Sequence, residues 1–148
     1  MLFLVLEKTL VMIKPDHADS AVEILGELDN YGRRLITRRV EAVPQEVIEA
    51  HYSVHKGKSF FDYMTKYFAG KDVVIAVYQG EGVIEKLREA AGPTDPAKAS
   101  KETIRGKYSN DSLEQAINEG RPVRNVVHCS DSPAEAEREI GVWQKYLK

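Results

Sequence analysis

Apolar residues recur along the chain at two spacings, one that fits β-strands and one that fits α-helices. Residues 3–13 (FLVLEKTLVMI) are mostly β-branched or large and apolar, which predicts a strand. Lys14-Pro15-Asp16 ends this strand, because the residue before a proline is driven away from the helical conformation. Similar runs predict strands over residues 34–43, 73–78 and 123–128, and the run at 73–78 is apolar enough for a central strand.

Between these runs, apolar residues fall on one face of a helix. The first such stretch runs from Ala18 to Leu28 and closes at Asn30-Tyr31-Gly32, where Gly32 predicts a glycine C-cap. Ser132-Pro133-Ala134-Glu135 predicts a capped helix start with proline at the first helical position. The predicted helices cover residues 18–28, 45–55, 60–69, 82–91, 111–119 and 132–143.

The predicted elements follow the order β-α-β-(αα)-β-α-β-α. Strands separated by helices, with few tight hairpins, predict the α+β class and a ferredoxin-like βαββαβ sandwich, in which helices pack on an antiparallel sheet and extra helices are added. The chain has 148 residues and no repeat or linker that divides it. We therefore expect a single domain over residues 1–148.

Charge and cysteine content narrow the functional classes. Lysine and arginine number 21 and aspartate and glutamate 23, for a net charge of −2, which argues against a nucleic-acid-binding surface but leaves room for a small cationic pocket. The apolar N-terminal stretch meets Glu7 and Lys8 too early for a signal peptide or a membrane span. Cys129 is the only cysteine. We expect a cytoplasmic protein that binds neither nucleic acid nor membranes.

A histidine and a carboxylate are predicted to meet near the last strand and helix. His128 lies about 10 Å before the turn at Asp131, at strand spacing. Glu139 lies roughly 10 Å into the following helix, so the two side chains are level if the helix folds back beside the strand. A carboxylate on one imidazole nitrogen leaves the other free to attack. A surface histidine beside an ordinary ion pair is the alternative that this pattern leaves open.

The order of several motifs favours the chemical interpretation. The chain resembles the nucleoside diphosphate kinase family over nearly its whole length, and the NxxHxSDS pattern around His128 is the most specific part of the resemblance. The matching segments are Glu7–Asp16 (EKTLVMIKPD), His51–Phe61 (HYSVHKGKSFF), Gly92–Pro96 (GPTDP), Thr103–Gly106 (TIRG) and Arg124–Trp143 (RNVVHCSDSPAEAEREIGVW).

The resemblance implies a nucleophile and two residues that support it. His128 matches the histidine that the family phosphorylates, Glu139 the carboxylate that orients it, and Ser130 the hydroxyl beside that pair. The implied reaction is a ping-pong transfer of a γ-phosphoryl group from a nucleoside triphosphate, typically ATP, to a nucleoside diphosphate.

The resemblance also implies a set of residues that contact the phosphates. Lys14 and Tyr52 match the lysine and tyrosine near the transferred phosphate. Arg88, Arg105 and Thr94 match the groups that hold the nucleotide phosphates. Phosphoryl transfer needs positive charge around the phosphate oxygens, and arginine suits this role through its planar fork of donors. Because the chain has no P-loop, side chains must hold the phosphates.

The remaining contacts implied by the resemblance concern the nucleoside and the metal. Asn125 matches the amide that contacts the sugar, and Phe60 the aromatic ring on which the base stacks. A stacked ring with few base-edge donors predicts weak discrimination among bases. Mg²⁺ is expected to arrive on the nucleotide phosphates, because the sequence offers no carboxylate cage for it. Family members assemble as tetramers or hexamers built from dimers, so we expect a homo-oligomer.

Three segments depart from the family pattern. Residues 17–21 (HADSA) lack the usual glycine and arginine, and residues 107–123 hold an insertion of about ten residues relative to shorter members. Cys129 replaces a small residue beside the nucleophile, so one hypothesis is that peroxide lowers activity, and the alternative is an inert buried thiol. The insertion could be a flap over the nucleotide, part of a subunit interface, or an inert addition.

Two other functions compete with this interpretation. The first is a non-catalytic regulatory domain of the same fold, which would be expected to lack some of the histidine, lysine and arginine set. The second is a metal-dependent hydrolase that uses His51 and His55, which lie four positions apart on a predicted helix but lack an obvious third ligand.

Overall fold

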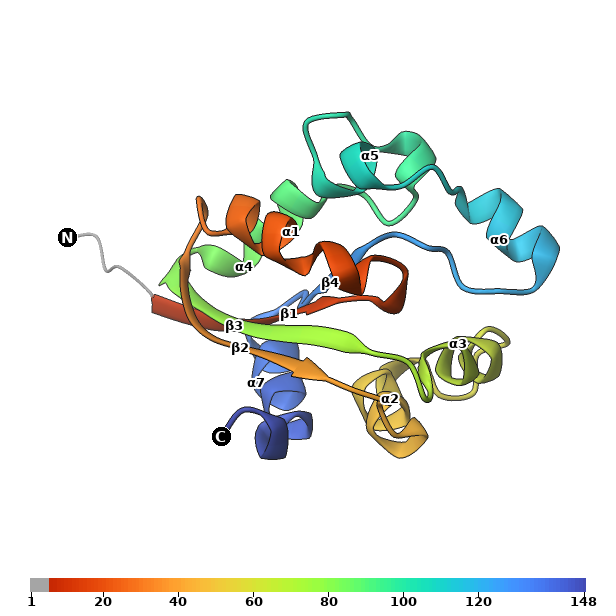
Figure 1. Ribbon diagram of the computed structural model, residues 1–148, viewed down its shortest axis with the longest axis horizontal. Helices are drawn as coiled ribbons and strands as arrows, with labels where there is room; N and C mark the ends of the chain where they lie inside the picture. The colour runs from red at the N-terminus through yellow and green to blue at the C-terminus, as the bar shows by residue number, and fades with distance from the viewer. Residues whose placement is uncertain (1–5) are drawn as a thin grey trace.

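The computed structural model describes residues 6–148, which form a four-stranded antiparallel sheet with helices on both faces (Figure 1). The strands are β1 (Leu6–Ile13), β2 (Arg33–Val40), β3 (Val73–Glu81) and β4 (Val127–Cys129), in the order β2-β3-β1-β4. The α-helices are α1 (Ala21–Leu28), α2 (Gln45–His51), α3 (Phe61–Phe68), α4 (Val83–Ala91), α5 (Ile104–Tyr108), α6 (Leu113–Glu119) and α7 (Pro133–Val142). Short 3₁₀ helices cover Pro15–Ser20, Ser53–His55, Pro96–Lys98 and Gln144–Tyr146. This confirms the predicted ferredoxin-like α+β sandwich.

Alternate residues of the central strand β1 supply two separate hydrophobic cores. Val11 and Ile13 pack toward α1 and α4, whereas Leu10 and Met12 pack toward α2, α3 and α7. All four are fully buried, and successive strand side chains point to opposite faces of a sheet. Figure 1 shows the same division, with α1 and α4 on one side of the sheet and α2 and α7 on the other.

The edge strand β4 carries His128 into the second of these layers. It pairs with β1 so that His128 lies opposite Met12. Its neighbours Val127 and Cys129 pack with the α1 and α4 core, so His128 points to the face covered by α2 and α7. The sheet thus places His128 beside the two helices that carry its neighbours in the site.

Most predicted elements are present with small changes in their ends. The predicted cap of α7 is confirmed, because Ser132 Oγ accepts a hydrogen bond from the Glu135 backbone N–H at 3.1 Å, with Pro133 at the first helical position. The helix predicted over residues 45–55 ends at His51 and continues as a 3₁₀ turn. Residues 3–5 of the first predicted strand lie outside the described residues.

Three predictions about local structure were wrong. Gly32 does not cap α1, which ends at Leu28 with Asp29 as its C-cap in a right-handed conformation. A Cβ at Gly32 would instead meet Val83 Cγ2 at 2.6 Å. The last strand covers 127–129 and not 123–128, because Val126 has a φ of 77° that breaks the extended backbone. No helix was predicted between residues 92 and 110, yet α5 lies there, and Thr103 caps it through its hydroxyl.

Among residues 6–148, no helix combines the length and the apolar character needed to cross a bilayer.

Candidate active site

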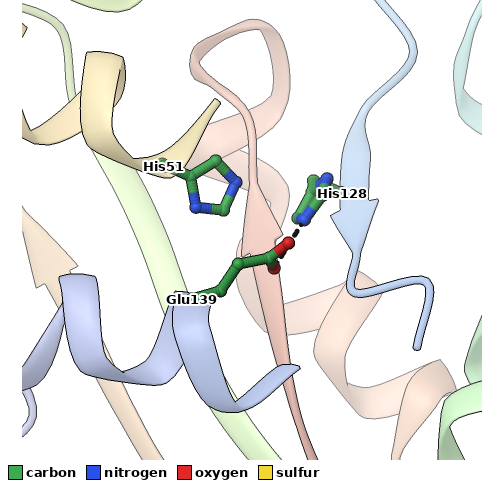
Figure 2. A group of neighbouring side chains, drawn as sticks. All are labelled: His51, His128 and Glu139. Carbon is green, nitrogen blue, oxygen red and sulfur yellow. Dashed lines mark hydrogen bonds and ion pairs between the residues drawn. The ribbon is translucent and has the colours of Figure 1, made fainter. Parts of the chain in front are cut away.

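The predicted pair of His128 and Glu139 forms in the structure. Nε2 of His128 lies 2.8 Å from Oε1 of Glu139, and the same carboxylate oxygen accepts a hydrogen bond from Ser130 Oγ at 2.7 Å. Figure 2 shows Glu139 reaching from α7 to the lower nitrogen of the His128 ring. Ser130 is in turn tied to β1, since its hydroxyl lies 3.3 Å from both the N–H and the carbonyl oxygen of Leu10. Glu139 is 3% exposed, and its contacts with His128 and Ser130 fix the orientation of the carboxylate.

This surrounding keeps the His128 ring neutral. Burial, followed by the charges of Lys14 and Arg105, lowers the pKa of His128 to about 3. A neutral ring that donates its Nε2 proton to Glu139 leaves a lone pair on Nδ1. His128 therefore has an unprotonated nitrogen available for attack at neutral pH.

Lys14 lies at the end of β1 and contacts the predicted sugar-binding residue. Its Nζ donates to Asn125 Oδ1 at 2.5 Å, and Asn125 Nδ2 donates to the backbone carbonyl of Thr94 at 2.9 Å. Burial and the neighbouring Arg105 lower the pKa of Lys14 to about 7. Three predicted site residues from distant parts of the sequence are thus joined in one chain of hydrogen bonds.

Arg105 forms hydrogen bonds to the backbone segments that surround this chain of bonds. Its guanidinium donates to three backbone carbonyls, those of Gly92 at 2.6 Å, Val127 at 2.7 Å and Asn125 at 3.1 Å. Arginine has five N–H groups, so two remain for other acceptors. Arg88 on α4 is exposed, and its charge is close enough to lower the pKa of Arg105, after the larger effect of burial. The two guanidiniums therefore lie in one region.

A strained turn sets the spacing between Asn125 and His128. Val126 has a φ of 77°, and the Val127 N–H donates to the Asn125 carbonyl at 2.8 Å across it, which is a γ-turn of the rare strained form. Asp16 holds this turn by accepting the Val126 N–H at 3.1 Å. Lys14 holds it as well, through its own N–H on the Val126 carbonyl at 2.8 Å. The sequence analysis missed this turn, because valine gives no signal for a positive φ.

The aromatic residues predicted near the nucleotide occupy two different settings. Tyr52 is 7% exposed, and its ring centroid lies 5.9 Å from that of His128. Burial raises the pKa of the Tyr52 phenol, so it is a neutral donor. Phe61 packs in the core, whereas Phe60 is only partly buried and lies beside His55, with ring centroids 5.2 Å apart and the two planes tilted by 59°. Phe60, the ring predicted to stack on the base, is therefore the more accessible of the two phenylalanines.

The structure does not support the metal site made of His51 and His55. Within the described residues, the group that could hold a metal consists of His51, His128 and Glu139, whose nearest ligand atoms all lie within 4.8 Å of one another. His55 is not a member, and its Nδ1 lies 3.0 Å from Lys58 Nζ on the surface. The direct contact of His51 with His128 was not foreseen, although His51 had been noted as a candidate ligand.

The family model for nucleoside diphosphate kinase matches residues 7–147 of this chain. The chain belongs to the nucleoside diphosphate kinase family. Two relatives with that name come from Desulfitobacterium hafniense (37% identity over 93% of this chain and 87% of the relative) and Pyrococcus furiosus (38% identity over 94% and 83%).

Solved structures of nucleoside diphosphate kinases share the fold. One is a transition-state mimic of the Borrelia burgdorferi enzyme with bound vanadate and ADP, at a TM-score of 0.87 and 25% identity, covering 97% of this chain and 90% of that one. Another is the Halobacterium salinarum enzyme in complex with CDP, at a TM-score of 0.79 and 29% identity, covering 96% and 91%. These comparisons confirm the family resemblance that the sequence motifs indicated.

Cys129, one of the departures from the family pattern, points away from His128. Its Sγ lies 3.8 Å from the Leu87 carbonyl oxygen on α4, on the opposite face of the sheet. Burial raises the pKa of the thiol to about 11, so little thiolate exists at neutral pH. The peroxide hypothesis stays a prediction, and this geometry argues against it.

The segment predicted to hold the insertion, residues 107–123, contains an ion pair between its two arms. Asp111 accepts two hydrogen bonds from Arg121, at 2.7 and 2.9 Å, and a third from the Arg124 backbone N–H at 2.8 Å. Helix α6 lies between the two partners, at the periphery of the molecule (Figure 1). Of the apolar residues on α6, Ala116 is buried, whereas Leu113 and Ile117 are 39% and 62% exposed.

We expect Asp111→Asn to lower the free energy of unfolding by about 2 kcal/mol, because the change leaves Arg121 and the Arg124 N–H with a weaker acceptor in a largely buried position. Glu119→Gln is the matched control, since Glu119 is a second and more exposed partner of Arg121. Urea unfolding measures both. Equal losses in the two variants would contradict a clamp at Asp111.

Proposed function

We propose that this chain is an active nucleoside diphosphate kinase that carries the γ-phosphoryl group on Nδ1 of His128. The observation that supports this proposal most strongly is the hydrogen bond from His128 Nε2 to Glu139, which leaves Nδ1 as the free nitrogen. The positive charges of Lys14 and Arg105 act on the same ring. A nucleophile beside cations suits a reaction in which charge spreads over the phosphate oxygens.

In the first half-reaction, the Nδ1 lone pair of His128 attacks the γ-phosphorus of ATP. The N–P bond forms while the bond from phosphorus to the β,γ-bridging oxygen breaks, and ADP leaves with that electron pair. In the second half-reaction, a terminal phosphate oxygen of a nucleoside diphosphate attacks the same phosphorus. The N–P bond then breaks and its electron pair returns to Nδ1. One pocket serves both directions, which is the basis of ping-pong kinetics.

Each remaining site residue has a proposed role that its surroundings support. Lys14, Arg88 and Arg105 neutralise phosphate oxygens, and the neutral Tyr52 hydroxyl, which has no hydrogen-bond partner among the described residues, donates near the reacting phosphate.

The nucleoside is bound by a second set of residues. The Asn125 amide contacts the sugar, the Thr94 hydroxyl contacts a phosphate, and the partly buried Phe60 ring stacks on the base. Stacking accepts every base, so we expect several nucleoside diphosphates to serve as acceptors.

Mg²⁺ is proposed to enter on the nucleotide phosphates. Mg²⁺ prefers six oxygen ligands, whereas the candidate metal group among residues 6–148 contains two imidazoles and one carboxylate. The ion would neutralise charge on the β- and γ-phosphate oxygens.

Two further expectations rest on the sequence alone. Assembly as a tetramer or hexamer and a cytoplasmic location both remain predictions.

The regulatory-domain alternative predicts an incomplete site. The described residues hold the nucleophile, its orienting carboxylate and the basic residues together, with His128, Glu139 and Ser130 in direct contact. This completeness favours the enzyme. The test is the appearance of a phosphoenzyme with ATP that GDP discharges.

The low pKa of Lys14 predicts proton uptake when a nucleotide binds. At about pH 8 the free enzyme holds most of Lys14 neutral, since its pKa is about 7, and a bound phosphate raises this pKa so that a proton is taken up. At about pH 6 Lys14 is already protonated, so this uptake disappears. Titration calorimetry with ADP in two buffers of different ionisation enthalpy measures the difference. Lys14→Met should remove the extra uptake at the higher pH, and an unchanged uptake in that variant would contradict the assignment.

A further inference from the structure

His51 lies against the proposed nucleophile but has no part in the scheme above. It is the last residue of α2 and is 1% exposed. Its ring centroid lies 4.6 Å from that of His128, with the two planes at 78°. Figure 2 shows one nitrogen edge of His51 directed toward His128 and Glu139.

A hydrogen bond from Trp143 decides which nitrogen of His51 carries the proton. Trp143 directly follows α7 and is fully buried. Its Nε1 lies 2.9 Å from His51 Nδ1. The indole N–H can only donate, so Nδ1 of His51 must present its lone pair. The proton of the neutral ring therefore lies on Nε2. A doubly protonated ring would set two N–H groups against each other.

This Nε2–H group has no acceptor among the described residues, although it is buried. An unpaired buried donor is costly, and such groups call for an explanation. The nearly perpendicular rings suit an N–H edge directed at the π-face of His128. The face of an aromatic ring is its electron-rich part, so the contact is attractive while His128 is neutral.

The hydrogen bond from Trp143 to His51 also affects whether His51 can bind a metal ion. His51, His128 and Glu139 have ligand atoms close enough for a divalent metal, and two histidines with a glutamate form a known type of Zn²⁺ site. A metal needs the lone pair of His51 Nε2, whereas Trp143 forces a proton onto that atom. A metal-bound histidine ordinarily uses its other nitrogen as a donor, and here the indole stands in that place.

We propose that the Trp143 indole locks His51 in its Nε2–H tautomer. In this form His51 is a positioning residue that holds the His128 ring in its hydrogen bond with Glu139. Because Nε2 of His51 carries a proton, it has no lone pair with which to bind a divalent metal. This inference rests on the proposed function, because it takes His128 as the phosphorylated group. Phosphorylation at Nδ1, with the proton still on Nε2, gives the His128 ring a positive charge. The positive end of the His51 N–H opposes that charge, so His51 also makes the phosphoryl group easier to release.

The kinetic test compares His51→Phe with Tyr146→Phe. The first variant keeps a ring but removes the N–H, whereas the second alters a ring that packs on Trp143 with centroids 5.8 Å apart and leaves the His51 bond intact. We expect His51→Phe to form phosphoenzyme about tenfold more slowly with an unchanged KM for ATP, and to hold a larger phosphorylated fraction at a fixed ATP-to-ADP ratio. His51→Gln, which keeps an acceptor and a donor, should recover part of the rate. Tyr146→Phe should match the wild type.

The binding test uses Zn²⁺ alone, without nucleotide. Trp143→Phe frees His51 to change tautomer, so we expect it to bind one Zn²⁺ at least about tenfold more tightly than the wild type. Adding His51→Phe to that variant should remove the gain. A wild-type protein that binds Zn²⁺ as tightly as Trp143→Phe overturns the tautomer lock.

The two proposals fail in different ways. If the wild type forms no phosphoenzyme, the proposed function fails. If the wild type forms it and His51→Phe behaves as Tyr146→Phe does, the positioning role of His51 fails while the proposed function stands. Circular dichroism confirms that each variant is folded before either measurement.

Discussion

His128→Ala is expected to lower nucleoside diphosphate kinase turnover by at least about 10⁴-fold, because it removes the nitrogen that we propose carries the phosphoryl group between the two half-reactions. The loss should be complete for phosphoenzyme formation with ATP. The measurement is a coupled assay of turnover, with ATP as donor and GDP as acceptor.

Nucleotide binding separates a lost nucleophile from a damaged pocket. The His128 ring is not a member of the hydrogen-bonded chain from Lys14 through Asn125 to Thr94. The Kd of the variant for ADP should therefore stay within about threefold of the wild type. Glu139→Gln is the graded comparison, since its amide can still accept from His128 and should slow transfer without abolishing it. Turnover that survives in His128→Ala would contradict the role of His128.

Arg105→Lys is expected to be a severe change although it keeps the charge. The Arg105 guanidinium donates to three carbonyls, one at Gly92 after α4 and two at Asn125 and Val127, where the chain enters β4. A lysine ammonium is a single point that cannot reach all three and still face a phosphate. We expect a loss of about 3 kcal/mol in the free energy of unfolding and roughly a hundredfold loss in kcat/KM. Urea unfolding and steady-state kinetics measure the two effects.

Arg88→Lys provides the matched control. Arg88 is exposed and makes no hydrogen bond to the protein within residues 6–148, so its replacement should change the free energy of unfolding by less than about 0.5 kcal/mol. Its kcat/KM should still fall, because the proposed role of Arg88 is to contact phosphates. If Arg88→Lys destabilised the protein as much as Arg105→Lys, the three carbonyl bonds would not explain the difference.

The sequence predicted the contact of His128 with Glu139 because both positions follow from regular geometry. A strand and a capped helix advance by known distances per residue, so two side chains at equal distances from the turn become level. The observed separation of 2.8 Å confirms this prediction. The ferredoxin-like sheet could also be predicted from the sequence, because the order of strands and helices restricts the possible topologies.

Features that depend on tertiary contacts could not be predicted in this way. The γ-turn at Val126 is held by hydrogen bonds to Asp16 and Lys14, which lie near the N-terminal end of the sequence. These bonds offset the preference of a β-branched residue for a negative φ. Gly32 was taken for a cap, whereas its lack of a side chain serves the close approach of Val83. The role of His51 depends on a partner 92 positions away, and no local pattern records that.

The most direct test of the account is intact-mass spectrometry of the enzyme after brief incubation with ATP and Mg²⁺, repeated after GDP is added. The account predicts a gain of one phosphoryl group that is stable to base, labile to acid, absent in His128→Ala and discharged by GDP. An enzyme that binds ADP but gains no phosphoryl group would contradict the phosphohistidine mechanism and favour a regulatory domain of the same fold.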